Sequence, residues 1–259
     1  MVYELNESHF EHSLSLTGEI VVEPSDDLLF DRLGADLTDA ALKALRDRGV
    51  FHLALSGGST PEPFYMRLCT DPRFRAIPWG STHIWLVDER RVPADDDRLN
   101  FRMIKSVLVD HIPIRTRQVH PMPVMEENAA ELYEAELRSI VPDGRLDFIL
   151  LGMGDDGHTA SLFPGSRGLQ ENSSWIAAND GPGVTPPPRL TMTYPLINAG
   201  RELAVLATKA KKAPMLRSIH DQLASAGPDI QKYPITGVNP AAGTLTWYLD
   251  AAAAGAKEA

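Results

Sequence analysis

The sequence predicts an α/β protein built on an open, doubly wound, mostly parallel sheet with helices on both faces. Short apolar runs alternate along the chain with segments whose apolar residues recur at helical spacing. Several of these runs lead directly into loops rich in glycine or charge, which is typical of strand–loop–helix units. No internal repeat or low-complexity linker is visible, so we expect one domain over residues 1–259.

The first helix is predicted from apolar residues that recur every third or fourth position between Leu29 and Leu45. Ser25 and the two aspartates after it are a typical helix start, and Gly49 is a typical helix end. The apolar run Phe51–Leu55 then predicts a strand, and Pro61 suits the first turn of the next helix.

The same arrangement recurs further along the chain. Strands are predicted at 83–87, 146–151, 203–207 and 244–249, and helices at about 99–109, 126–140 and 212–223. The proline-dense stretch 181–188 can be neither a helix nor a central strand, so we expect an exposed connection in preference to an active-site lid.

Composition restricts the function. The chain has 25 Lys and Arg against 35 Asp and Glu, a formal net charge of −10, which disfavours nucleic acid or an anionic membrane as a general partner. The N-terminus lacks a basic region followed by an apolar run, and no apolar stretch is long enough to span a bilayer, so we expect a cytoplasmic protein. Cys69 is the only cysteine, which excludes an internal disulfide, and we expect it to be structural.

The loop after the 51–55 strand has the composition of a phosphate-binding loop. Ser56, Gly57, Gly58, Ser59 and Thr60 combine hydroxyls, two glycines and the backbone N–H groups of a helix start. The spacing matches neither GxxxxGK[ST] nor GxGxxG, so neither a nucleoside triphosphate nor a dinucleotide is implied. Since ligands bind beyond the carboxyl ends of parallel strands, we expect this loop to border a crevice.

Two further loops should reach the same crevice. After the 83–87 strand, Asp88 faces the crevice as a candidate catalytic carboxylate and Arg90 is a candidate phosphate ligand, although a solvated charge run is the simpler interpretation. After the 146–151 strand, three glycines surround Asp156 and bring His158 to the expected start of a short helix. Histidine can accept and return a proton near neutral pH, so His158 is the candidate catalyst and Asp156 its orienting partner.

Basic residues near two later segments complete the expected site. Lys212 shares a helical stripe with apolar residues and should lean toward the protein, whereas Lys209 and Lys211 are alternatives for the same role. Arg189, which follows three prolines, is a secondary candidate. No HExxH pattern or second suitably spaced histidine accompanies His158, so we expect neither a metal nor another cofactor.

Five segments together resemble the 6-phosphogluconolactonase family: LALSGGSTP, VDERRVP, LDFILLGMGDDGHTASLFPGS, PPPRLTMTYPLIN and LATKAKKA. The resemblance implies a fold related to glucosamine-6-phosphate deaminase and ribose-5-phosphate isomerase, and hydrolysis of 6-phospho-D-glucono-1,5-lactone. It also implies that Ser56–Thr60, Arg90 and Lys212 bind phosphate and that His158 acts on the lactone. The segment Lys209-Ala210-Lys211 departs from the sequence of small residues, including glycine, that is typical of that family at this position.

Two rival functions stay open at this stage. The first is an isomerase or deaminase acting on an amino-sugar phosphate, although His158 is followed by Thr159-Ala160-Ser161 and not by the Asn-Glu pair suited to that chemistry. The second is a sugar-phosphate sensor without turnover, which an intact His158 disfavours. The sequence does not determine the oligomeric state or the preference between δ and γ lactones.

Overall fold

The computed structural model describes residues 13–181, 184–185 and 188–256. Its main sheet has seven strands, all parallel, in the order β1-β10-β9-β6-β2-β3-β5. Their bounds are β1 Glu19–Glu23, β2 Phe51–Leu55, β3 Thr82–Leu86, β5 Val119–His120, β6 Phe148–Gly152, β9 Glu202–Ala207 and β10 Thr244–Asp250. The prediction of a mostly parallel sheet is therefore confirmed.

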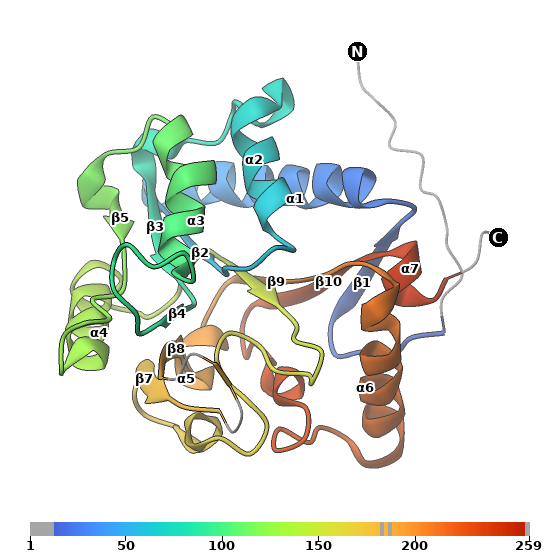
Figure 1. Cartoon of the computed structure of the whole chain (residues 1–259). Coiled ribbons are helices and arrows are strands. Elements are labelled where there is room, and N and C mark those ends of the chain that lie inside the picture. Colours follow the sequence, from blue (N-terminus) through green and yellow to red (C-terminus); the bar gives the residue numbers. More distant parts are fainter. Residues whose placement is uncertain (1–12, 182–183, 186–187, 257–259) are drawn as a thin grey trace.

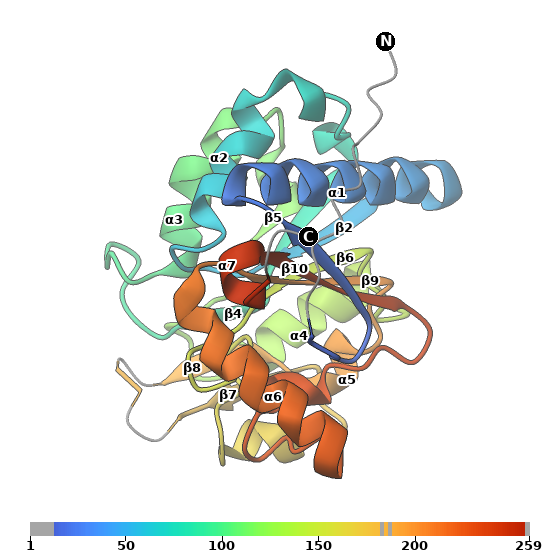
Figure 2. The ribbon, with the colours of Figure 1, turned by 90° about the vertical axis from the view of Figure 1, so that its right-hand side faces the viewer.

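Helices cover both faces of this sheet, as Figures 1 and 2 show, with α1 and α2 on one side and α5 and α6 on the other. The helices are α1 Asp26–Arg48, α2 Glu62–Thr70, α3 Asn100–Val107, α4 Ala129–Ile140, α5 Tyr194–Ile197, α6 Ala213–Ala226 and α7 Ala251–Ala254. The start and end of α1 are as predicted, because the Ser25 side chain accepts a hydrogen bond from the N–H of Leu28 and Gly49 adopts φ +74°. No helix in the described ranges is long and apolar enough to cross a membrane.

A second, three-stranded antiparallel sheet was not expected. Its order is β4-β8-β7, with β4 Asp88–Arg90, β7 Ile176–Asn179 and β8 Arg189–Met192. The charged residues after β3 were predicted to form a loop, but they form the strand β4, because β8 supplies hydrogen-bonding partners from about a hundred residues further along the chain. The strand-like character predicted for residues after Arg189 is confirmed by β8.

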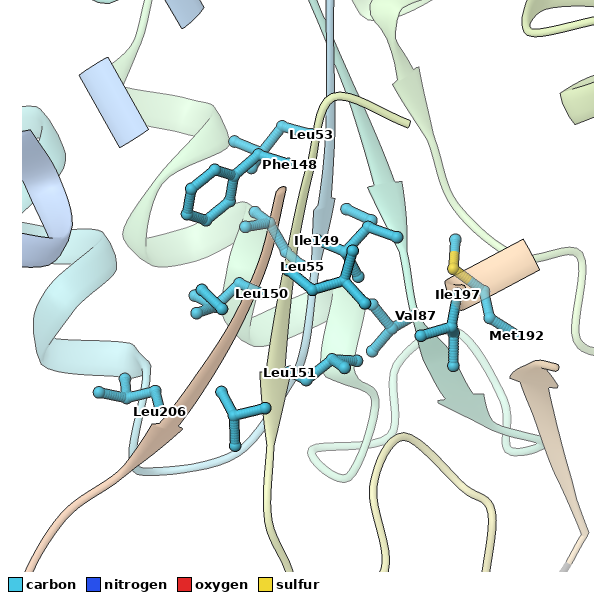
Figure 3. Packing of buried hydrophobic residues seen from close by; sticks show 14 of the residues in the cluster. Leu53, Leu55, Val87, Phe148, Ile149, Leu150, Leu151, Met192, Ile197 and Leu206 are labelled. Carbon is cyan, nitrogen blue, oxygen red and sulfur yellow. The ribbon is translucent and has the colours of Figure 1, made fainter. Parts of the chain in front are cut away.

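The core fills the space between the sheet and its helices. All five residues of β2 are buried, as are the first four of β6. Figure 3 shows alternate residues of β6 on opposite sides of the strand, with Phe148 and Leu150 on one side and Ile149 and Leu151 on the side of Val87, Met192 and Ile197. This packing on both faces fixes the strands, and therefore the loops that leave their carboxyl ends.

The chain order of the strands reverses at the centre of the main sheet. From β2 the chain continues outward through β3 to β5, and it then returns to place β6 on the other side of β2. Loops that leave adjacent strands at such a switch point diverge and leave a crevice between them. The loop after β2 and the loop after β6 border this point.

A histidine cluster lies in β2, β3 and β5, near the end of the sheet opposite that crevice. His52 is 6% exposed and its Nδ1 accepts a hydrogen bond from the indole N–H of Trp85 at 3.3 Å. His83 Nδ1 and His120 Nε2 lie 2.8 Å apart. Burial, together with the charges of His83 and His120, lowers the pKa of His52 to about 4.

The proline-dense connection is only partly described. Residues 182–183 and 186–187 lie outside the described residues, so the predicted exposed connection across 181–188 stays a prediction there. Val184, between these two gaps, lines a cleft at the carboxyl ends of the central strands.

Candidate active site

A cleft of about 520 Å³ lies at the carboxyl ends of the central strands. Its walls come from the loops after β2, β6 and β9 and from the strands β4 and β8. Every site residue proposed from the sequence lines it: Ser56, Gly57, Gly58, Ser59, Thr60, Asp88, Arg90, Asp156, His158, Arg189 and Lys212. The roles of these residues stay predictions, but their convergence on one cleft is a structural finding.

The loop Ser56–Thr60, here called the phosphate loop, is anchored by hydrogen bonds at Ser56, whereas the backbone N–H groups of its other residues have no acceptor among the described residues. The Ser56 hydroxyl donates to the carbonyl of Leu150 in β6 at 2.8 Å, and the Tyr65 hydroxyl donates to the Ser56 carbonyl at 2.6 Å. Within the described ranges, no protein acceptor takes a hydrogen bond from the N–H groups of Gly57 to Thr60. Gly58 adopts φ +101°, which favours glycine, and the loop therefore presents a row of donors to the cleft.

Arg90 and Arg189 are directly opposite each other in the β4–β8 pair. Arg90 donates to the carbonyl of Arg98 at 2.5 Å, whereas the side chain of Arg189 makes no hydrogen bond or ion pair with any described residue, although only 6% of Arg189 is exposed. Burial, and then the positive charge of Arg90, lowers the pKa of Arg189. Two adjacent guanidinium groups repel each other unless an anion binds between them. This arrangement suits a phosphate.

Asp88 is buried beside the two arginines and both of its oxygens accept hydrogen bonds. Oδ2 accepts from the Ser161 hydroxyl at 2.6 Å, and Oδ1 accepts from the Asn100 amide at 3.3 Å. Asp88 does face the cleft, as the sequence predicted. Its partners hold it in one orientation, which suits a residue that accepts a hydrogen bond from a substrate hydroxyl.

His158 is held in place by its own loop. The prediction that it begins a short helix is wrong: it precedes a tight turn closed by an isolated bridge between Thr159 and Leu162. Asp156 Oδ1 accepts from the His158 Nδ1 at 2.5 Å and from the His158 backbone N–H at 3.1 Å. Because a carboxylate can only accept, Nδ1 carries the proton and Nε2 is left as the acceptor.

The surroundings of His158 support this orientation. The ring of Phe163 lies 4.8 Å from the imidazole, centroid to centroid, and a Cβ at position 154 would lie 2.1 Å from His158 Nδ1, so only glycine fits there. Burial raises the pKa of Asp156, but the hydrogen bonds and charge of His158 outweigh burial, and the pKa lies below its ordinary value. Asp156 is thus a carboxylate at neutral pH and can orient the imidazole.

Lys212 leans into the protein, as predicted, and is buried. Its ammonium group donates to the carbonyl of Met153 at 2.7 Å and forms an ion pair with Asp155, a side chain that is 67% exposed. The hydrogen bond from Lys212 lowers the pKa of Asp155. Lys211 also lines the cleft, whereas Lys209 does not, and the Lys209 backbone N–H donates to Asp250 at 2.7 Å. Of the three lysines named from the sequence, Lys212 and Lys211 thus line the cleft, and their role in binding phosphate stays a prediction.

Several cleft residues were not singled out from the sequence, and they include Asn100, Asp155, Ser161 and Phe163. Asp155 could have been identified from its place in the same glycine-rich loop as His158. Asn100 and Ser161 carry no sequence signal, because their importance depends on contacts with the distant Asp88. Within the described residues, no group of three or more His, Cys, Asp or Glu side chains could hold a metal ion.

Comparison with known proteins identifies relatives over most of the chain. The family described as "Glucosamine-6-phosphate isomerases/6-phosphogluconolactonase" matches residues 24–247. The 6-phosphogluconolactonase of Synechocystis sp. is 38% identical over 231 residues, which cover 86% of this chain and 91% of that protein. The "GDH/6PGL endoplasmic bifunctional protein" of Oryctolagus cuniculus is 38% identical over 232 residues, but the match spans only 28% of its length. The crystal structure of 6-phosphogluconolactonase from Thermotoga maritima is 28% identical, with a TM-score of 0.76 over 90% of this chain and 99% of that chain.

Proposed function

Because the chain belongs to the glucosamine-6-phosphate isomerase/6-phosphogluconolactonase family, we propose that it hydrolyses 6-phospho-D-glucono-1,5-lactone to 6-phospho-D-gluconate, a step of the oxidative pentose phosphate pathway. One observation carries the proposal: an oriented His–Asp pair and an anion-binding cluster share a single cleft. We also propose a cytoplasmic location.

The phosphate end of the cleft consists of the phosphate loop, Arg90 and Arg189, with Lys211 and Lys212 nearby. The loop supplies unpaired N–H donors, and Arg189 is a buried cation without an acidic partner among the described residues. Binding of a phosphate would satisfy both groups at once. Lys212 can bind the phosphate only if its ion pair with the largely exposed Asp155 breaks, or if its ammonium group contacts Asp155 and the phosphate together.

The lactone end lies at His158. Nε2 accepts a proton from water as the water attacks the C1 carbonyl, and the imidazolium then protonates the ring oxygen as the C1–O bond breaks. Asp156 keeps Nδ1 protonated and stabilises the imidazolium. General base catalysis contributes a factor of roughly 10²–10⁴, and positioning by the phosphate contributes further, so the chemistry requires no metal step.

The deaminase alternative is less well supported. His158 is followed by Thr159-Ala160-Ser161, and the side chain of Ser161 is committed to Asp88, so this segment offers no acidic residue beside the imidazole. A sensor that only binds sugar phosphate does not need a proton acceptor, so it does not account for the hydrogen bond by which Asp156 orients His158.

One assay distinguishes these functions. Freshly prepared 6-phosphogluconolactone is mixed with the purified chain in EDTA, and the rate of acid release is corrected for spontaneous opening. We expect catalysed hydrolysis. Turnover of glucosamine 6-phosphate in its place would indicate a deaminase, and binding of 6-phosphogluconate without turnover of either compound would indicate a sensor.

A further inference from the structure

The side chains of the three residues of β4 lie on opposite faces of the strand. Asp88 and Arg90 line the cleft, whereas Glu89 between them points to the opposite side and is only 1% exposed. A carboxylate at that depth is costly unless its oxygens are hydrogen-bonded. Glu89 therefore needs an explanation that the site described above does not give.

The Glu89 carboxylate caps the first turn of α3. Oε1 accepts from the backbone N–H groups of Arg90 at 2.7 Å and Asn100 at 2.8 Å, and Oε2 accepts from the N–H of Phe101 at 2.7 Å. Leu99, the residue before α3, offers no side-chain cap of its own. One side chain thus joins the backbone at Arg90 to the start of α3.

The first residue of α3 reaches from this junction into the cleft. The Asn100 amide donates to the Asp88 carbonyl at 2.9 Å, and Asn100 is 2% exposed. A Cβ at Gly57 would lie 1.9 Å from Asn100 Oδ1, so the amide packs directly against the phosphate loop. Through Asn100, the start of α3 contacts both β4 and the phosphate loop.

We propose that Glu89 and Asn100 are positioning residues that set the spacing between the Arg90 guanidinium and the phosphate loop, and thereby the affinity for the substrate's phosphate. Neither side chain needs to contact the lactone. Because the proposal concerns only the phosphate end, a perturbation should affect phosphorylated substrates and leave the chemistry at His158 intact. The inference rests on the proposed function for its substrate.

Glu89→Gln tests the proposal because it keeps the shape of the side chain but places an amide N–H₂ against a backbone N–H donor. Burial raises the pKa of Glu89 to about 7, against the effect of its backbone hydrogen bonds, so assays belong at about pH 8, where the carboxylate is ionised. We expect the KM for 6-phosphogluconolactone to rise by about tenfold with kcat within about twofold. The kcat/KM for unphosphorylated glucono-1,5-lactone should stay within about twofold of wild type.

Glu134→Gln is the matched control. Glu134 also joins distant backbone, since its Oε2 accepts from the N–H groups of Trp175 at 2.8 Å and Ile176 at 3.1 Å, but it does not line the cleft. It should lower the melting temperature without changing KM for either lactone. Equal losses on both lactones in Glu89→Gln, or an unchanged KM in the folded variant, would overturn the proposal.

A second variant covers the case in which Glu89→Gln does not fold. Asn100→Ala keeps the backbone N–H that Glu89 caps, and it removes the amide that bonds to the carbonyl and Oδ1 of Asp88 and packs against the phosphate loop. The Ser161 hydroxyl still holds the Asp88 carboxylate, so the variant should raise the same KM selectively. If the wild-type chain has no lactonase activity, the proposed function fails by itself. The positioning role is then decided by titration calorimetry with 6-phosphogluconate, for which Glu89→Gln should raise Kd by about tenfold and Glu134→Gln should not.

Discussion

Replacing Arg189 by Met should weaken substrate binding and stabilise the fold at the same time. Methionine retains most of the apolar stem and removes the guanidinium. That group is buried, lies opposite Arg90, and has no acidic partner among the described residues. It is therefore unfavourable for folding unless an anion binds.

The magnitudes follow from these contacts. Loss of a charge-assisted bond to phosphate costs about 1.5–3 kcal/mol, so KM for 6-phosphogluconolactone should rise by roughly 10- to 150-fold with little change in kcat. The nearby carboxylates of Asp88 and Glu89 offset only part of the cost of burying this cation beside Arg90. Its removal should therefore stabilise the unliganded protein by about 1 kcal/mol, which raises Tm by a few degrees. Initial rates with fresh lactone and thermal melts without phosphate measure the two effects.

A control variant separates this result from a general effect of losing an arginine. Arg145 lies outside the cleft and donates to the carbonyls of Ala199 at 3.3 Å and Ala242 at 2.9 Å. Arg145→Met should lower Tm and leave KM unchanged. A folded Arg189→Met variant with a wild-type KM and a lowered Tm would refute the reasoning, because Arg189 would then be a structural cation.

Three further predictions concern other groups. His158→Asn should lower kcat by roughly 10²–10⁴ with little change in the Kd of 6-phosphogluconate, measured by initial rates and calorimetry. A folded variant that keeps more than about a third of wild-type kcat would contradict this role and make Asp88 or Asp156 the next candidate for the base. Lys212→Ala should raise KM for the phosphorylated lactone by about one to two decades, and equal wild-type activity on phosphorylated and unphosphorylated lactone would remove the basis for this expectation. His52 has a folded-state pKa of about 4, below that of the unfolded chain, so its contribution to stability is present above about pH 6.5 and is lost as pH falls to about 4. The control is His52→Gln, whose amide oxygen can still accept from Trp85. In urea titrations the free energy of unfolding of the wild type, relative to that of the variant, should fall by about 3 kcal/mol between pH 7 and pH 4. A difference that stays constant with pH would contradict the assigned pKa.

The main sheet could be predicted because its central strands are apolar runs followed by glycine-rich turns. Phe51–Leu55 and Phe148–Gly152 are such runs, and their burial from both faces leaves a clear signal in the sequence. The strand β4 has no such signal, since all three of its residues are charged and its partner β8 is remote in the chain. A strand of that kind is specified by tertiary pairing and not by local composition.

The candidate site shows the same division. His158 and the phosphate loop could be found because loops at the carboxyl ends of parallel strands meet, and because glycine, serine and histidine have recognisable chemistry there. Glu89 and Asn100 could not, since their contacts form only when α3 packs beside β4. The helix expected at His158 was wrong for a related reason: the turn is fixed by the Asp156 hydrogen bonds and by the bridge between Thr159 and Leu162.

The reversal of strand order at β2 and β6 also determines the stage of folding at which the cleft forms. The phosphate loop is synthesised early, whereas β6, His158 and Lys212 follow only after β3 and β5 have been added on the other side of β2. Contacts across such long stretches of chain form slowly and late in folding. A sugar phosphate should therefore bind only the completed sheet, so that added ligand slows unfolding without assisting the early steps of assembly.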